Sequence, residues 1–116
     1  MKVYGIPNCN TVKKAIDWLK SNALNFEFHD YKKKGITKEK LQEWSTEVGW
    51  EKLLNKKGTI WRALDLEQQQ KITDVSSAIE LMIEKTSVIK RPVVETGYKL
   101  LVGFDEAEYN DSVKKK

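Results

Sequence analysis

The first thirty residues carry the pattern that most restricts the fold. Residues 2–6 form a short, mostly apolar segment that predicts a strand, and apolar residues between positions 12 and 19 recur at helical spacing. Residues 26–29 then alternate between apolar and polar, which predicts a second strand. A helix that joins two strands within about twenty residues is typical of a right-handed parallel crossover. This segment therefore predicts half of an α/β sheet.

Cys9 is the only cysteine of the chain, and it lies in the polar turn between the first predicted strand and the helix. A helix N-terminus presents unpaired N–H groups and the positive end of the helix dipole. Lys13 and Lys14 add positive charge nearby. These features favour the thiolate, which is the nucleophilic form of cysteine. A buried structural cysteine is the alternative, but Cys9 follows Pro7 and Asn8 and does not belong to an apolar stripe.

The middle of the chain predicts a helical block, and the last third returns to strands. Helical spacing begins at Thr37 and ends at Gly49, after a polar turn at residues 32–35. Shorter helical pieces follow at residues 50–54, 60–64 and 78–83, the last behind Ser77, which has capping-box spacing to Glu80. Residues 92–95 and 98–102 predict a hairpin with a two-residue link at positions 96–97, and a last helix begins within residues 104–109.

Size and composition exclude several kinds of protein. The 116 residues suffice for one hydrophobic core, and one cysteine cannot form an intrachain disulfide. One cysteine and one histidine do not supply the ligand set of a zinc site without scattered carboxylates, so we predict no bound metal. The net charge of +4 is concentrated in lysine runs at residues 32–34, 56–57 and 114–116, which lack the interleaved aromatic residues of a nucleic-acid groove. We expect a monomer in the bacterial cytoplasm, without a membrane segment.

The order of these elements is that of the thioredoxin superfamily: a strand, a cysteine, a helix and later a hairpin that begins with Pro92. At the level of motifs the chain resembles the arsenate-reductase-like (ArsC) family, and within it the small thiol reductases of the YffB type, with the Spx-type regulators as relatives. The joint occurrence of the motifs is more specific than any one of them. The matching segments cover nearly the whole chain and are residues 4–15, 28–33, 48–51, 53–55, 58–62, 89–93 and 101–106.

The resemblance implies a fold and a set of site residues. It implies one domain over residues 1–116 with a thioredoxin-like mixed four-stranded sheet, and a helical insertion at about residues 37–88 between the second and third strands. It also implies that Cys9 is the catalytic thiol and that Arg91 faces it, followed by a cis Pro92. The forked donors of arginine suit a thiolate, a carboxylate or an oxyanion.

Further residues around the cysteine are candidates for substrate binding. They comprise the loop residue Asn8, the backbone N–H groups of Asn10 and Thr11, and the chain beside Pro92, where an extended disulfide can pair. Arg62 is a candidate second anion contact, although an exposed arginine stacked on Trp61 explains it equally well. We expect the single histidine, His29, to be structural and not a general base.

The function that we predict is that of a glutathione-dependent thiol–disulfide oxidoreductase. Cys9 attacks a mixed disulfide and becomes glutathionylated, with no other bound cofactor. Because position 12 is valine and the chain has no second cysteine, an external thiol must release the adduct. We expect glutathione to be the co-substrate, and glutaredoxin is a candidate partner.

Two alternatives stay open. The first is an arsenate reductase that uses glutathione or glutaredoxin. Arsenate-reducing relatives carry Cys-Gly and several clamping arginines, whereas here Asn10 follows Cys9, and Asn55 and Gly103 fall near two of the clamp positions. The second alternative is an Spx-like regulator that binds RNA polymerase. Such regulators carry a Cys-x-x-Cys switch, which Val12 interrupts here.

Overall fold

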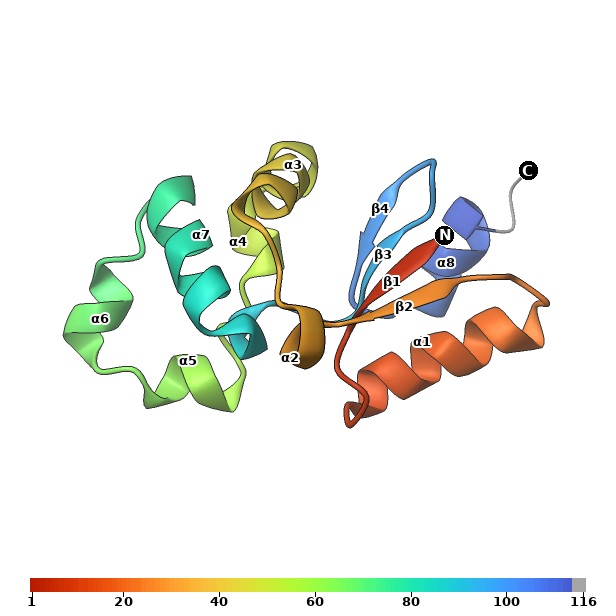
Figure 1. Cartoon of the computed structure of the whole chain (residues 1–116), viewed down its shortest axis with the longest axis horizontal. Helices are drawn as coiled ribbons and strands as arrows, with labels where there is room; N and C mark the ends of the chain where they lie inside the picture. Colours follow the sequence, from red (N-terminus) through yellow and green to blue (C-terminus); the bar gives the residue numbers. More distant parts are fainter. Residues whose placement is uncertain (114–116) are drawn as a thin grey trace. The chain divides into compact units, whose positions relative to one another are not determined.

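The computed structural model describes residues 1–113, so the lysine run at residues 114–116 lies outside the described residues. The chain divides into two compact units (Figure 1). The first consists of Met1–Lys34 together with the C-terminal part that starts at Arg91, and the second is Gly35–Lys90. Within residues 1–113, no helix has the length and apolar character needed to cross a bilayer.

The first unit contains the mixed four-stranded sheet that the sequence predicts. Its strands are β1 (Lys2–Gly5), β2 (Glu27–Asp30), β3 (Val93–Glu95) and β4 (Leu100–Val102), in the order β2-β1-β3-β4. Helix α1 (Asn10–Ser21) joins β1 to β2, which pair in parallel, so the predicted parallel crossover is confirmed. The pairs β1–β3 and β3–β4 are antiparallel.

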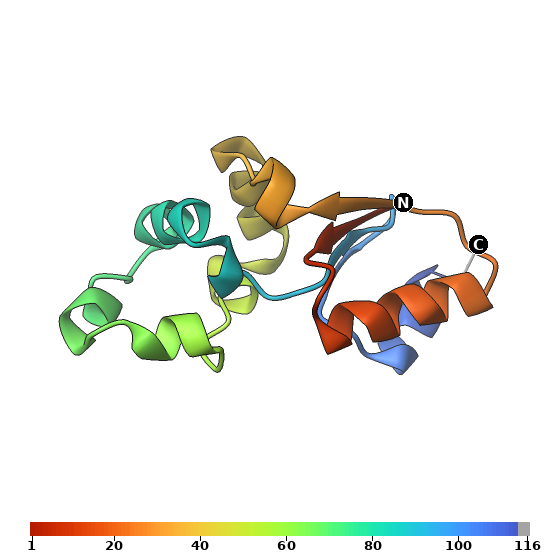
Figure 2. The ribbon, with the colours of Figure 1, turned by 60° about the horizontal axis from the view of Figure 1, so that its bottom comes forward.

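One face of this sheet is covered by two helices. Figure 2 shows α1 and α8 (Glu106–Val113) on the same side of the strands. Tyr109 of α8 is fully buried, and its hydroxyl donates a hydrogen bond of 2.7 Å to the carbonyl of Gly103. Burial of each large apolar side chain stabilises the fold by about 1.5–3 kcal/mol. The buried cluster consists of Val3, Ala15, Leu19, Val94, Leu101, Tyr109 and Val113.

The hairpin between β3 and β4 has a longer link than the sequence predicts. Glu95 pairs with Leu100, so four residues connect the strands and the predicted two-residue link is wrong. The hydroxyl of Thr96 accepts hydrogen bonds from the N–H groups of Tyr98 (3.1 Å) and Lys99 (2.8 Å) and donates one to the Lys99 carbonyl (2.7 Å). A threonine side chain thus replaces backbone hydrogen bonds in the turn, which a simple Thr-Gly pattern does not reveal.

The second unit is helical. Its buried side chains come mainly from its longer helices and include Leu41, Trp44, Ile79 and Met82. An antiparallel bridge between Leu54 and Ile89 closes the unit near its C-terminal end. Its elements are α3 (Lys38–Val48), α4 (Trp50–Leu53), α5 (Thr59–Ala63), α6 (Leu66–Gln70), α7 (Val75–Glu84) and the 3-10 turn η1 (Thr86–Val88).

Helix α3 begins and ends where the sequence predicts. Thr37 is its N-cap, and the hydroxyl of Thr37 accepts a hydrogen bond from the N–H of Lys40 at 3.1 Å. Gly49 follows the last helical residue with φ of 88°, a conformation that glycine adopts without steric cost.

Other helix boundaries differ from the sequence prediction. Residues 31–34 form a one-turn helix, α2 (Tyr31–Lys34), and not a plain polar turn. At the start of α2, the Asp30 carboxylate accepts a hydrogen bond of 2.8 Å from the N–H of Lys32. Helix α7 begins behind Asp74, which forms the capping box with Ser77, so Ser77 is inside the helix and is not its cap. Helix α6 was not predicted because it buries no side chain and therefore shows no apolar stripe.

Candidate thiol site

Cys9 lies at the start of helix α1, where it is the N-cap residue. Its backbone is extended (φ −124°, ψ 124°), and its carbonyl accepts the first helical hydrogen bond from the N–H of Lys13 at 3.0 Å. The cysteine is free and partly exposed. The sulfur is thus accessible and sits where the first-turn N–H groups of α1 are available to an anion.

The pairing of the strands brings Arg91 to the same end of the sheet as Cys9. Tyr4, near the end of β1, pairs with Val93, the first residue of β3, in the antiparallel β1–β3 pair. The segment that follows β1 and carries Cys9 therefore starts at the same end of the sheet as the segment that precedes β3 and carries Arg91. The Arg91–Pro92 peptide bond is cis, as the resemblance implies. The carbonyl of the buried Pro92 accepts a hydrogen bond from the N–H of Gly103 at 2.8 Å, which ties this segment to the end of β4.

Opposing effects act on the Cys9 thiol, and the net result is a pKa below the ordinary value. The largest single effect is partial burial, which raises the pKa of Cys9. The N–H of Val12, the guanidinium of Arg91 and the N–H of Thr11 donate hydrogen bonds to the sulfur, and the charge of Arg91 adds attraction; these effects lower the pKa and together outweigh burial. The arrangement therefore favours a thiolate.

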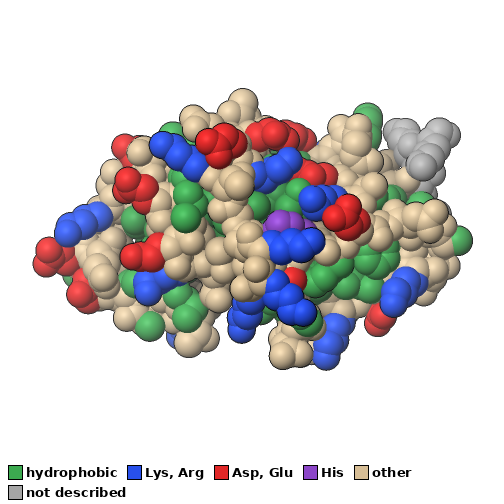
Figure 3. All heavy atoms as spheres, in the orientation of Figure 1, with side chains coloured by type: hydrophobic (Ala, Val, Ile, Leu, Met, Phe, Trp, Pro, Cys, Tyr) green, Lys and Arg blue, Asp and Glu red, His purple; other side chains and the backbone are tan. Residues whose placement is uncertain are grey.

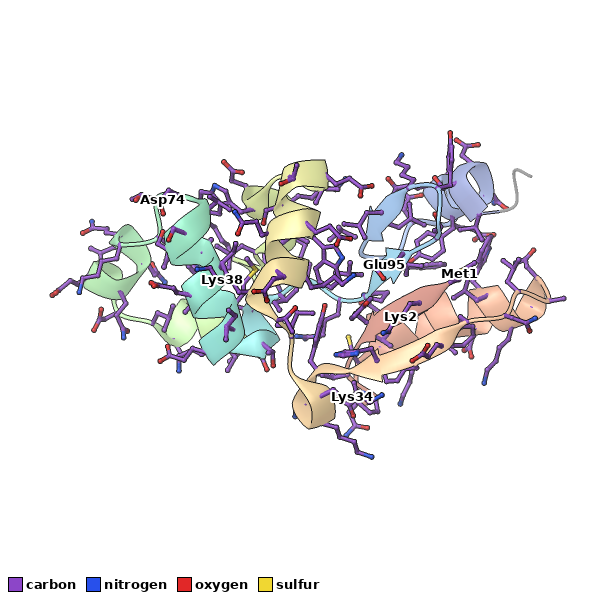
Figure 4. The ribbon with its side chains drawn as sticks, turned by 45° about the horizontal axis from the view of Figure 1, so that its top comes forward. Met1, Lys2, Lys34, Lys38, Asp74 and Glu95 are labelled. Carbon is purple, nitrogen blue, oxygen red and sulfur yellow. The ribbon has the colours of Figure 1, made fainter. Side chains whose placement is uncertain are left out.

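A cluster of aromatic and acidic side chains lies on the sheet, and the charge of Arg91 acts on one of its members, Tyr31. The hydroxyl of Tyr4 donates a hydrogen bond to the Glu95 carboxylate at 3.0 Å, and the ring of Tyr4 lies 6.3 Å from that of Tyr31. Burial raises the pKa of Tyr31, the charges at Tyr4 and Glu95 raise it further, and only the charge of Arg91 opposes them. Tyr31 therefore stays a neutral phenol. Figure 4 shows Glu95 on β3 beside Lys2 on β1, with which it pairs.

The other predicted site residues fall into two groups. Asn8, Asn10 and Thr11 are exposed beside Cys9, and the N–H of Thr11 points at the sulfur. Arg62 belongs to the second unit, where it is exposed on α5, so its predicted contact with an anion stays a prediction. His29 is partly buried in β2, and its ring lies 4.8 Å from that of Tyr4, which agrees with a structural role.

Sequence reasoning did not single out Tyr31 and Glu95. Tyr31 lies about sixty residues before both Arg91 and Glu95 in the chain, yet its pKa responds to the charges of both. The strand order carries the signal that could have found this relation, because it places β1 between β2, which Tyr31 follows, and β3, which ends at Glu95. Among residues 1–113, no three His, Cys, Asp or Glu side chains are grouped so that they could hold a metal ion.

The mixed sheet, the cis proline and the cysteine at the start of the first helix define a thioredoxin-like protein. The chain belongs to the ArsC family, whose sequence model matches residues 4–112. It is similar to the solved structure of a YffB protein, with 45% identity, 97% coverage of both chains and a TM-score of 0.91. It is also similar to an arsenate reductase related protein from Brucella melitensis, with 44% identity, coverage of 95% of this chain and 91% of the other, and a TM-score of 0.75.

The family also includes regulators of transcription. The global transcriptional regulator Spx of Streptococcus agalactiae is 29% identical over 104 residues, which are 88% of this chain and 74% of the regulator. The fold is therefore that of arsenate-reductase-like thiol oxidoreductases, and it is shared by proteins that act as regulators.

Proposed function

We propose that this protein is a glutathione-dependent thiol–disulfide oxidoreductase that uses Cys9 as its nucleophile. The observation that carries the proposal is the convergence of Arg91 and the first-turn N–H groups of α1 on one accessible sulfur, which lowers the pKa of Cys9. A lowered thiol pKa increases the fraction of thiolate, which is the attacking species, and makes the thiolate a better leaving group.

The first step is the attack of the Cys9 thiolate on the glutathione sulfur of a mixed disulfide. A new S–S bond forms between Cys9 and glutathione, the original S–S bond breaks, and the substrate leaves as a thiolate that takes a proton from water. The substrate is thereby reduced and Cys9 is oxidised to the mixed disulfide. The backbone beside Pro92 can pair with the extended glutathionyl group, and Arg91 is available for one of its carboxylates.

The second step needs an external thiol, because Cys9 is the only cysteine of the chain. The thiolate of a second glutathione attacks the glutathionyl sulfur, glutathione disulfide forms, and the Cys9 thiolate leaves. The hydrogen bonds that stabilise the resting thiolate also stabilise it as the leaving group. The net reaction consumes one mixed disulfide and one glutathione, and it yields one free thiol and one glutathione disulfide.

A glutathione-coupled assay tests this proposal. The protein is given a mixed disulfide of glutathione with a small thiol, and glutathione disulfide is measured with glutathione reductase and NADPH. We expect turnover by the wild type and none by Cys9→Ser, and mass spectrometry should detect Cys9 with one glutathionyl group when glutathione is limiting. Equal turnover by both proteins would refute the proposal.

The similarity to Spx supports a second candidate, a regulator that binds RNA polymerase. Such binding needs a surface and no catalytic sulfur. Binding of purified RNA polymerase that persists in Cys9→Ser, together with absent turnover in the wild type, would favour the regulator. Arsenate is a weaker proposal as substrate, because a single Arg91 contributes about 1.5–3 kcal/mol of charge-assisted binding where a clamp of several arginines contributes more.

A further inference from the structure

We propose that the groove between α1 and strand β2 binds an extended acidic segment of a protein substrate and so presents its disulfide to Cys9. This proposal deepens the proposed function and rests on it for the chemistry. The groove has a volume of about 560 Å³, within the range of about 300–1,000 Å³ that is usual for ligand sites. Its lining residues are Pro7, Ile16, Lys20, Phe26, Phe28, Asp30, Lys33 and Lys34.

The floor of the groove is apolar. Ile16 comes from α1, and Phe26 and Phe28 come from the segment of β2; all three are only partly buried. Figure 3 shows hydrophobic side chains gathered over the region where α1 and β2 lie in Figure 1. Ligand sites in proteins are commonly lined by apolar and aromatic side chains with a few charged groups.

The rim of the groove is mostly cationic. Lys20 lies in the last turn of α1, and Lys33 and Lys34 lie on α2, whereas Asp30 is the one acidic residue of the lining. Figure 3 shows Lys and Arg side chains at the borders of the apolar patch, and Figure 4 marks Lys34 on α2. Apolar side chains flanked by carboxylates are therefore the chemistry that complements this surface.

The strand beside the groove favours an extended occupant. β2 is the terminal strand of the order β2-β1-β3-β4, so it pairs within the sheet on one side only, with β1. An extended peptide can add to such an edge with main-chain hydrogen bonds while alternate side chains enter the neighbouring groove. Phe26, Phe28 and Asp30 already show this alternation, because they face the groove at every second position.

The groove also reaches the end of the sheet at which the Cys9 loop begins. Gly5 pairs with Asp30 in the parallel β1–β2 pair, so Lys33 and Lys34 follow β2 at the end of the sheet where the Cys9 loop follows β1. Pro7 lines the groove and lies two residues before Cys9 in the chain. A segment lying along β2 therefore runs toward the end of the sheet that carries the Cys9 loop.

A peptide-binding measurement tests the groove without the chemistry. The probe is a synthetic, fluorescent eight-residue peptide in which glutamates alternate with leucines, and the protein is Cys9→Ser. We expect Lys20→Glu/Lys34→Glu to weaken binding at least tenfold, and the matched control Lys52→Glu/Lys57→Glu, which carries the same charge change on exposed lysines outside the groove, to change it less than twofold. A peptide with glutamine in place of glutamate should also bind at least tenfold more weakly.

Kinetics with the cysteine present then separate the two proposals. One substrate is the same acidic peptide with a glutathionylated cysteine at its end, and the other is a small glutathione mixed disulfide. We expect Lys20→Glu/Lys34→Glu to lower the ratio of the two kcat/KM values at least tenfold. Turnover of both substrates with an unchanged ratio would overturn the groove and leave the proposed function standing. Groove-dependent binding without any turnover would overturn the function and keep the groove. Equal weakening by both lysine pairs, or binding of anionic vesicles but not of the peptide, would also overturn the groove.

Discussion

Replacing Arg91 by glutamine should slow the attack of Cys9 on a mixed disulfide by roughly 3- to 8-fold at a pH below the folded pKa of Cys9. Arg91 donates a hydrogen bond to the sulfur and also attracts it by charge. A hydrogen bond to a charged group contributes about 1.5–3 kcal/mol. Because Cys9 is only partly buried, water weakens the effect, and we take the lower part of this range, about 1.5–2 kcal/mol. About 1.36 kcal/mol changes a rate tenfold. Because the less stabilised thiolate is also more nucleophilic, with a Brønsted exponent of about 0.4–0.5, only about half of the loss appears in the rate, which gives the stated factor.

The assay for this prediction follows formation of the Cys9 adduct with glutathione disulfide in excess, by rapid mixing and mass spectrometry. Lys90→Gln is the matched control, because it removes one positive charge from an exposed neighbour of Arg91 that does not act on the sulfur. We expect the control to react within a factor of two of the wild type. A rate for Arg91→Gln that equals that of the control would refute the claim that Arg91 stabilises the thiolate.

Three further predictions concern stability. Tyr109→Phe removes the buried hydrogen bond to the Gly103 carbonyl and should lower the free energy of unfolding in urea by about 1–2 kcal/mol; no change would mean that water replaces it. Tyr31→Phe should leave stability unchanged or raise it by about 1 kcal/mol, because the buried Tyr31 hydroxyl has no hydrogen-bond partner among residues 1–113, and a clear loss would contradict this. The third compares wild type with Cys9→Ser: since the pKa of Cys9 is lowered on folding, the unfolded chain binds more protons between the folded pKa and the ordinary thiol value of about 8.5. The free energy of unfolding of the wild type should therefore rise relative to that of the variant as pH rises through that interval, and this difference should be lost as pH falls through the folded pKa. A relative free energy of unfolding that falls as pH rises would be incompatible with a stabilised thiolate.

The parts of the fold that the sequence predicted are those with a strong local signal. The apolar spacing of α1 and the caps of α3 at Thr37 and Gly49 follow from side chains close together in the chain. Helix α6 has no buried face, and the β3–β4 link depends on one hydroxyl of Thr96, so neither produces a periodic pattern. Local patterns identify elements that bury a face, and they miss elements held by individual polar contacts.

The site shows the same division. The position of Cys9 at a helix start follows from neighbouring residues, whereas its pairing with Arg91 came only from the family resemblance, since the two residues lie eighty-two positions apart in the chain. Strand register brings them together, and no spacing in the sequence encodes that register. The groove beside β2 was likewise absent from the sequence prediction, because Phe26 and Phe28 look like ordinary core residues until the edge position of the strand is known.

The pH dependence of alkylation at Cys9 tests the central claim most directly. Iodoacetamide reacts with the thiolate, and the chain has no other cysteine to obscure the result. We expect the rate profile of the folded wild type to give a pKa below that of the same cysteine in the urea-unfolded chain, and Arg91→Gln to move it back toward the unfolded value. A folded pKa equal to or above the unfolded one would contradict the claim that the folded site stabilises the Cys9 thiolate.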